Sequence, residues 1–175
     1  TDFGSILGYH AGSVGTATVT SGTWSNSNHL YVGGYGTGTL NLGAAIANTG
    51  GRQVDVQNRT AGAVNFQGPV TDASGTGTGI HLNLNTGSTI AFTGGIALST
   101  GANNAFTATG GGTITATQNN TTIVNTLVAT SGTALFVTNT QIGSAGLTFR
   151  SITAGTTTSS TSVGIFLDTT GVAPT

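Results

Sequence analysis

Side chains able to do acid–base chemistry are sparse in this chain of 175 residues. Asp55 and His81 occupy the same position of a repeat of about 26 residues, and a carboxylate beside an imidazole can act as an acid–base pair. We expect the two side chains to form an outward-facing ladder on neighbouring strands, about 5 Å apart. We interpret this ladder as an exposed ion pair worth at most ~1 kcal/mol, and not as a catalytic site.

The carboxylates are too few and too scattered for a polysaccharide-cleaving site. All of the acidic residues are aspartates, namely Asp2, Asp55, Asp72 and Asp168. Inverting glycosidases hold two carboxyl groups about 6.5–9.5 Å apart. The repeat places Asp55 and Asp72 in one coil but on different faces, and Asp168 several coils away. We therefore expect no catalytic residue and no enzymatic activity.

Metal and cofactor sites are also not expected. His10, His29 and His81 are isolated by their spacing, and the calcium-binding nonapeptide GGxGxDxUx is missing. Glycine-rich stretches such as Gly33–Gly38 do not precede a helix, so they predict turns and not phosphate-binding loops.

The composition limits the kinds of molecule that this chain is expected to bind. Only 4% of the residues are charged, Lys and Glu are absent, and the net charge is −1. This excludes the electrostatic surface that nucleic acids or anionic membranes require. No apolar run approaches the ~18–20 residues of a membrane-spanning helix, so we expect no membrane insertion. We expect the chain to be a mature piece, or a segment of something longer.

The strongest pattern is an internal repeat that alternates apolar and polar side chains. The stretch Val54–Val70 superimposes on Ile80–Ile96, with Phe66 on Phe92 and Gly68 on Gly94. Alternation over a period of 20–50 residues predicts the coil of a solenoid, in which side chains stack on those of the coil below.

The repeat continues along the chain with small insertions. For the first strand of successive coils we expect the inward residues Ile80, Phe106, Leu135 and Ile165. For the second strand we expect Ile90, Ile114 and Leu147. Since Phe149 falls beside Leu147, we predict an internal aromatic stack of Phe66, Phe92 and Phe149.

The first fifty residues repeat differently. The motif that begins at Gly15 recurs about 21 residues later at Gly36, so we expect Thr16 and Thr18 to stack on Thr37 and Thr39. A flat threonine array of this kind would suit ice binding, which is one alternative function. We divide one continuous solenoid into residues 1–50 and residues 51–175, whose period is about 26–30 residues.

Two segments carry a family resemblance. The segment SVGTATVTSGTWSNSNHLYVGGYGTGTLNLG contains a GTxTV strand, a W-x-N-S turn at Trp24–Ser27 and an LYVG strand at Leu30–Gly33. It resembles the passenger repeats of Gram-negative autotransporters and related giant surface proteins. TGGIALSTG and GLTFRSITAG resemble a second repeat type, found in very long bacterial β-strand-repeat proteins. The resemblance implies a β-solenoid that is exported.

We therefore expect an all-β, right-handed parallel β-helix of roughly 6–7 coils. Its expected function is a structural or adhesive segment of an extracellular bacterial surface solenoid, serving as stalk, fibre or adhesin scaffold. The alternatives are a self-assembling extracellular filament subunit and an ice-binding or polysaccharide-acting β-helix.

One outward column predicts a contact surface. The column that starts with Asp55 and His81 continues through Thr107 to Phe136 and Phe166, whose rings would face outward. Adjacent exposed aromatic rings mark contacts. We predict an interface at Phe136 and Phe166, either with another copy of the chain or with a flanking solenoid.

Overall fold

The computed structural model describes residues 6–7, 13–20, 23–24, 31–32, 37–47, 51–117, 125–155 and 163–171. The described chain forms strands, turns and bends, and it contains no helix. The same residues therefore offer no helix of the length and hydropathy that crossing a membrane requires.

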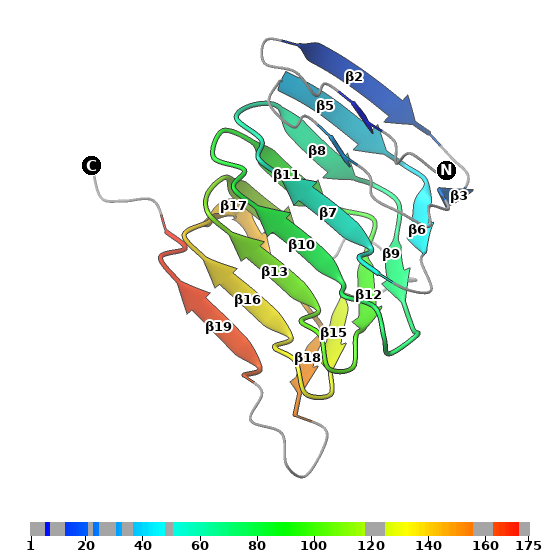
Figure 1. Cartoon of the computed structure of the whole chain (residues 1–175), viewed down its shortest axis with the longest axis vertical. Helices are drawn as coiled ribbons and strands as arrows, with labels where there is room; N and C mark the ends of the chain where they lie inside the picture. Colours follow the sequence, from blue (N-terminus) through cyan, green and yellow to red (C-terminus); the bar gives the residue numbers. More distant parts are fainter. Residues whose placement is uncertain are drawn as a thin grey trace.

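All but two of the described strands form three parallel sheets that run along the molecule (Figure 1). The first sheet contains β7 (Val54–Gln57), β10 (Ile80–Asn83), β13 (Phe106–Thr109), β16 (Leu135–Thr138) and β19 (Ile165–Asp168). The second contains β2 (Val14–Val19), β5 (Thr37–Leu42), β8 (Ala63–Phe66), β11 (Thr89–Phe92), β14 (Thr113–Ala116) and β17 (Gln141–Leu147). The third contains β3 (Thr23–Trp24), β6 (Ala45–Ala47), β9 (Val70–Asp72), β12 (Ile96–Ser99), β15 (Thr126–Ala129) and β18 (Ser151–Ala154).

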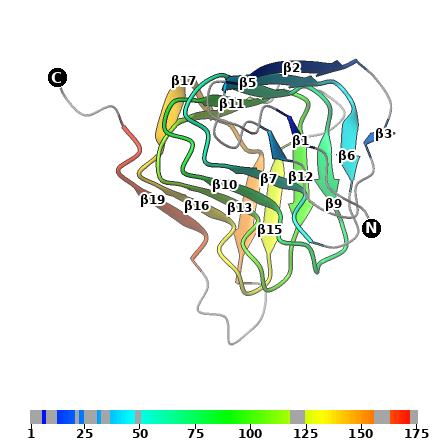
Figure 2. The ribbon, with the colours of Figure 1, turned by 45° about the horizontal axis from the view of Figure 1, so that its top comes forward.

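Each coil contributes one strand to each sheet in turn, which makes the molecule a parallel β-solenoid (Figure 2). The predicted fold class is thus confirmed. The stack has about five coils, fewer than the expected 6–7. The difference arises at the N-terminal end, where β1 (Ile6–Leu7) and β4 (Tyr31–Val32) form a separate two-stranded sheet and do not extend the first sheet.

The core consists of apolar columns in the predicted register. Val54 pairs with Ile80, Val64 with Ile90 and Val70 with Ile96. All six side chains are buried. Since alternate residues of a strand face the same way, one register turns every second side chain toward the core in all three sheets.

The aromatic stack is partly as predicted. The rings of Phe66 and Phe92 lie parallel, with centroids 4.6 Å apart. Phe106 meets Phe92 edge-on at 5.7 Å, and Phe149 meets Phe106 at 6.4 Å. Phe149 therefore reaches the core through Phe106 and does not stand in the column of Phe92.

The register of β17 differs from the prediction. Ile142, and not Leu147, pairs with Ile114, whereas Leu147 pairs with Ala116. The reason is an irregularity in β17, where extra residues lie opposite Thr115 and shift all that follows.

The register between strands of the first fifty residues also differs from the prediction. Thr16 pairs with Thr39 and Thr18 with Asn41, two residues further along than predicted. The shift keeps the inward and outward parity, and it places Ala17 over Leu40. The expected two-coil threonine array is therefore wrong.

A corner glycine recurs for a steric reason. Gly94 lies so close over Gly68 that a Cβ on Gly94 would be 2.3 Å from the carbonyl carbon of Gly68. A Cβ on Gly68 would in turn meet the carbonyl oxygen of Ala44 at 2.0 Å. The superposition of Gly68 on Gly94 in the repeat thus reflects close approach of the backbones between coils.

The chain leaves the first sheet through a left-handed corner in successive coils. The residue after each strand has a positive φ: Asn58 (57°), Leu84 (55°), Gly110 (75°), Asn139 (47°) and Thr169 (53°). Asparagine and glycine suit this conformation, whereas a leucine there is strained. Leu84 is also 50% exposed, so its side chain does little packing to offset that strain.

We predict that Leu84→Gly raises the free energy of unfolding by about 1 kcal/mol, because it removes the left-handed strain. Urea unfolding measures the change. Thr107→Gly, at an extended position of the same sheet, is the control and should lower stability by about 0.5–1 kcal/mol. Destabilisation by both variants would show that the corner at Leu84 carries no strain.

We predict that Phe92→Ala lowers the free energy of unfolding by about 3–5 kcal/mol, because it opens a cavity between the rings of Phe66 and Phe106. Val14→Ala serves as the control, since Val14 is 79% exposed and its truncation should cost less than about 0.5 kcal/mol. Similar losses in the two variants, measured by urea unfolding, would contradict a core built on the Phe66–Phe92 contact.

Candidate functional site

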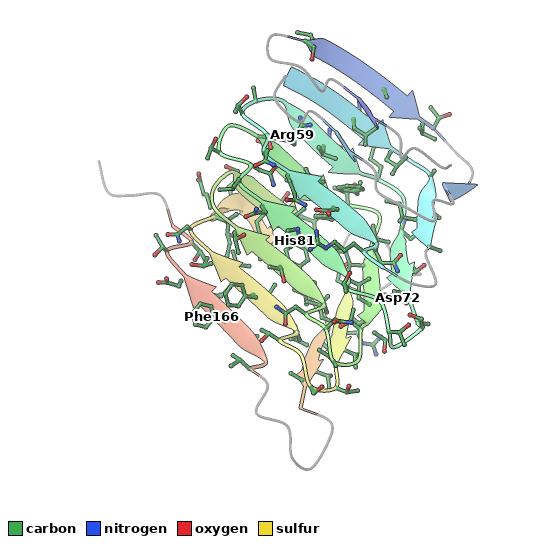
Figure 3. The ribbon with its side chains drawn as sticks, viewed as in Figure 1. Arg59, Asp72, His81 and Phe166 are labelled. Carbon is green, nitrogen blue, oxygen red and sulfur yellow. The ribbon has the colours of Figure 1, made fainter. Side chains whose placement is uncertain are left out.

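An outward column on the first sheet brings the candidate residues together. Asp55 pairs with His81, His81 with Thr107, Thr107 with Phe136, and Phe136 with Phe166. This is the predicted register, and Figure 3 shows His81 and Phe166 on the same sheet. The column has a polar end at Asp55 and an aromatic end at Phe166.

The polar end is a hydrogen-bonded cluster around Asp55. Arg52 Nη1 donates to Asp55 Oδ2 at 2.5 Å, and Gln57 Nε2 donates to Oδ1 at 2.7 Å. His81 Nδ1 lies 3.1 Å from Oδ1. Asp55 is only 8% exposed, so the expectation of a solvent-exposed ion pair is wrong. The repeat predicts that the side chain of Asp55 points outward, but it does not reveal what covers the face on which Asp55 lies.

The cluster holds Asp55 in its ionised form. Burial by itself raises the pKa of this carboxyl, but hydrogen bonds from His81, Arg52 and Gln57 outweigh burial and lower the pKa to about 2. A general base needs a pKa near the working pH and access to its substrate. Asp55 has neither property, so its chemistry is that of an anchor that fixes Arg52 and His81.

A groove of about 370 Å³ lies beside this cluster. Its lining residues are Arg52, Thr78, His81, Ala102, Asn103, Asn104 and Thr107. Asn103 Nδ2 donates to the carbonyl oxygens of Thr76 and Gly77 one coil away, each at 3.2 Å. Asn104 Oδ1 accepts from the backbone N–H of Thr133 at 2.9 Å. Both asparagines therefore bind neighbouring coils to one another.

The other carboxylates lie apart from Asp55. Asp72 pairs with Leu98 in the third sheet and is 4% exposed. Its Oδ1 accepts from the N–H and the hydroxyl of Ser74, at 2.8 and 2.6 Å. Asp168 ends β19, at the far end of the first sheet. Figure 3 shows Asp72 and His81 on different parts of the coil.

Three of the candidate residues, Asp2, His10 and His29, lie outside the described chain. Within the residues that the structure does describe, no three His, Asp, Glu or Cys side chains gather where they could hold a metal ion.

Two buried polar residues were missed by sequence reasoning. Arg59 is fully buried and donates to the carbonyl oxygens of Gly38 and Ala61, the latter at 3.0 Å. Burial lowers its pKa. Asn85 accepts from the backbone N–H of Arg59 at 3.2 Å and donates to the carbonyl oxygen of Val56 at 2.9 Å. The signal was present, because Asn85 follows Arg59 by one repeat, but an arginine is ordinarily assigned to the surface.

Asn125 is a third buried polar residue of this kind. Its Oδ1 accepts from the backbone N–H of Ile96, and its Nδ2 donates to the carbonyl oxygen of Thr148, both at 2.8 Å. One side chain thus joins the backbones on either side of it along the stack. This supplies partners to backbone groups that turns leave outside the sheets.

The aromatic end of the column is a stacked pair. The rings of Phe136 and Phe166 are 4.8 Å apart and 10° from parallel. Phe166 is 40% exposed, whereas Phe136 is half-buried beneath it. Their register is as expected, and their role as an interface stays a prediction.

No protein-family model, no curated protein and no solved structure matches this chain. The fold therefore rests on the register and packing described above. The resemblance to autotransporter passengers stays an inference from sequence motifs.

Asp55 should make stability pH-dependent in a defined window. Its pKa is lowered from 3.8 to about 2, so its contribution is complete above the unfolded-state pKa and is lost as the pH falls toward 2. We predict that Asp55→Asn removes about 2 kcal/mol at pH 7 and much less near pH 2. Urea unfolding at both pH values measures this difference.

The matched control is Asp168→Asn, because Asp168 is exposed. This variant should change stability by less than about 0.5 kcal/mol at either pH. An equal loss for Asp55→Asn at pH 7 and near pH 2 would contradict an ionised, hydrogen-bonded Asp55.

Proposed function

We propose that this chain is a structural or adhesive segment of an extracellular bacterial surface solenoid, acting as stalk, fibre or adhesin scaffold. The observation that carries the proposal is the uninterrupted register of the first sheet from β7 to β19. A solenoid whose coils contact only their neighbours provides length and a repeated surface. At ~4.8 Å per coil, five coils form a rod segment of roughly 24 Å.

The surface of this rod is consistent with an exposed location. The outward positions of the second sheet carry hydroxyl and amide groups, and Asn65 Nδ2 donates to Asn41 Oδ1 of the preceding coil at 2.7 Å. On the first sheet, Thr109 Oγ1 donates to Asn83 Oδ1 at 2.8 Å. Such ladders hydrate a surface with few charges and also join coils.

The proposal that the chain is exported rests on its passenger-type motifs. Within these motifs, Thr23–Trp24 forms β3 and Tyr31–Val32 forms β4. Adhesion, in this proposal, uses outward positions of the first sheet, where the groove beside His81 and the ring of Phe166 lie. The buried apolar columns, in this proposal, hold the coils of the scaffold together.

A surface scaffold must withstand extracellular proteases. We predict that proteinase K leaves the region from β7 to β14 as one protected fragment, because cleavage requires local opening of stacked coils. Leu82→Asp should abolish protection, since it places an unpaired charge in the core. Thr107→Asp, at an outward position of the next strand, is the matched control and should keep protection. Cleavage of the unaltered chain within β10–β13 under native conditions would overturn the proposed function.

A further inference from the structure

The groove beside His81 is formed by stacked coils within the first sheet. His81 stands on β10, which lies between β7 and β13 (Figure 1). Thr107 on β13 also lines the groove, and the other lining residues belong to the corners that precede these strands. Every lining residue falls in the part of the chain from 51 to 117, which the structure describes without a gap. The groove is therefore a feature of the stack itself and not of one of its ends.

The charges at the groove neutralise one another. Arg52 Nη1 lies 2.5 Å from Asp55 Oδ2, and Asp55 is ionised because its pKa is about 2. Arg52 is the only arginine among the described residues that line the groove, and no aspartate is among them. An ion pair of this kind leaves no net charge to attract an anion or a cation. The groove therefore favours a ligand that is polar but uncharged.

The imidazole of His81 is held in one orientation by Asp55. Nδ1 lies 3.1 Å from Asp55 Oδ1, and an ionised carboxylate can only accept a hydrogen bond. This contact assigns the proton to Nδ1, so that Nε2 of the neutral ring is an acceptor. Nε2 is at the outer end of the ring, and the side chain of His81 is 24% exposed. His81 thus presents a fixed acceptor at the groove.

Two threonine hydroxyls complete the polar lining. Thr78 Oγ1 is buried and has no hydrogen-bond partner in the described chain, while the backbone N–H of Thr78 is fixed by the carbonyl oxygen of Gly51 at 2.8 Å. Rotation about χ1 exchanges the methyl and hydroxyl groups of a threonine, so this hydroxyl reaches the groove without a backbone movement. Thr107 Oγ1 accepts from Asn104 Nδ2 at 3.4 Å and keeps its own O–H to donate. Donors and acceptors therefore lie side by side.

We propose that this groove binds a neutral saccharide. Each sugar hydroxyl both donates and accepts, so neighbouring hydroxyls of one ring can donate to His81 Nε2 and accept from Thr78 and Thr107. The methyl group of Ala102 lines the same groove and offers an apolar contact to the ring. The volume of about 370 Å³ lies near the lower limit of small-molecule sites, which suits a mono- or disaccharide.

This proposal deepens the proposed function, because it names the ligand class of an adhesive scaffold, and it rests on that function for its biological role. A shallow groove gives weak binding to a single saccharide. Display of many scaffold segments on one surface would raise the overall avidity without any new contact.

Titration of the ¹⁵N-labelled chain, followed by NMR, tests the proposal. The probes are lactose, chitobiose and galacturonate, each raised to about 20 mM. We expect lactose or chitobiose to bind with a Kd of about 0.1–10 mM and to shift the backbone signals of Thr78, His81 and Thr107. Lactose represents the galactosides of cell-surface glycans and chitobiose the N-acetylglucosamine of cell-wall polymers, so the two arms separate these sources.

Variants identify the groups that contact the sugar. His81→Phe and Thr78→Val should each weaken binding at least about 10-fold, because each removes one hydrogen-bonding group from the site. Thr78→Ser keeps the hydroxyl and should bind within about 3-fold of the unaltered chain. Thr78→Val should not lower the urea midpoint, since the hydroxyl has no partner in the fold. Thr115→Val, at an outward position of the second sheet, is the matched control and should leave binding unchanged.

The proposal is overturned if neither neutral disaccharide binds, or if galacturonate binds more tightly than both. Equal weakening by Thr78→Val and Thr115→Val also overturns it, because the sugar would then not occupy the groove. A chain that keeps its protease protection but binds no saccharide refutes only the ligand. A chain without that protection refutes the scaffold function, whichever sugar it binds.

Discussion

Stacking of like-sized apolar side chains along fixed columns is the interaction on which the structure depends. Val64 lies over Leu40 and under Ile90, and all three are at most 2% exposed. Burial of this kind contributes about 25 cal/mol per Å², so a coil out of register would lose several kcal/mol. The columns constrain only the strands, and the corners between them accommodate differences in coil length.

Stacking of the coils also explains why some polar side chains are buried. Corners carry backbone groups that no sheet pairs, and buried side chains such as Asn85 and Asn125 bind two of them across coils, the N–H of Arg59 and the carbonyl oxygen of Thr148. Asp55 shows how hydrogen bonding can outweigh burial on the outer face, because three donors keep its carboxylate ionised although it is buried. Asp55 looks like a candidate for chemistry in the sequence, yet in the fold it joins its coil to that of His81. The outward features that the structure describes on the first sheet are the groove beside His81 and the stacked pair of Phe136 and Phe166.

The alternation of apolar and polar residues predicted the repeat from Val54 to Ile96 and the whole outward column to Phe166. It succeeded there because the inward–outward alternation along the strands and the length of the coils give the same pairing. Alternation could not decide the pairing of Thr16, since a slip of two residues preserves parity and only the packing of Ala17 on Leu40 selects one register. The irregularity in β17 and the burial of Asp55 were equally hidden, because they depend on neighbours that are distant in sequence, whereas the repeat carried a signal for Arg59 in Asn85.

Engineered disulfides test the stacked register most directly, because the chain contains no cysteine. Ala91 and Thr115 are register partners, and neighbouring parallel strands lie about 4.8 Å apart, within the range that a disulfide spans. The account predicts rapid, complete oxidation of Ala91→Cys with Thr115→Cys, and little oxidation of Ala91→Cys with Thr113→Cys. Faster oxidation of the Thr113 pair would contradict the register and, with it, the solenoid built on these columns.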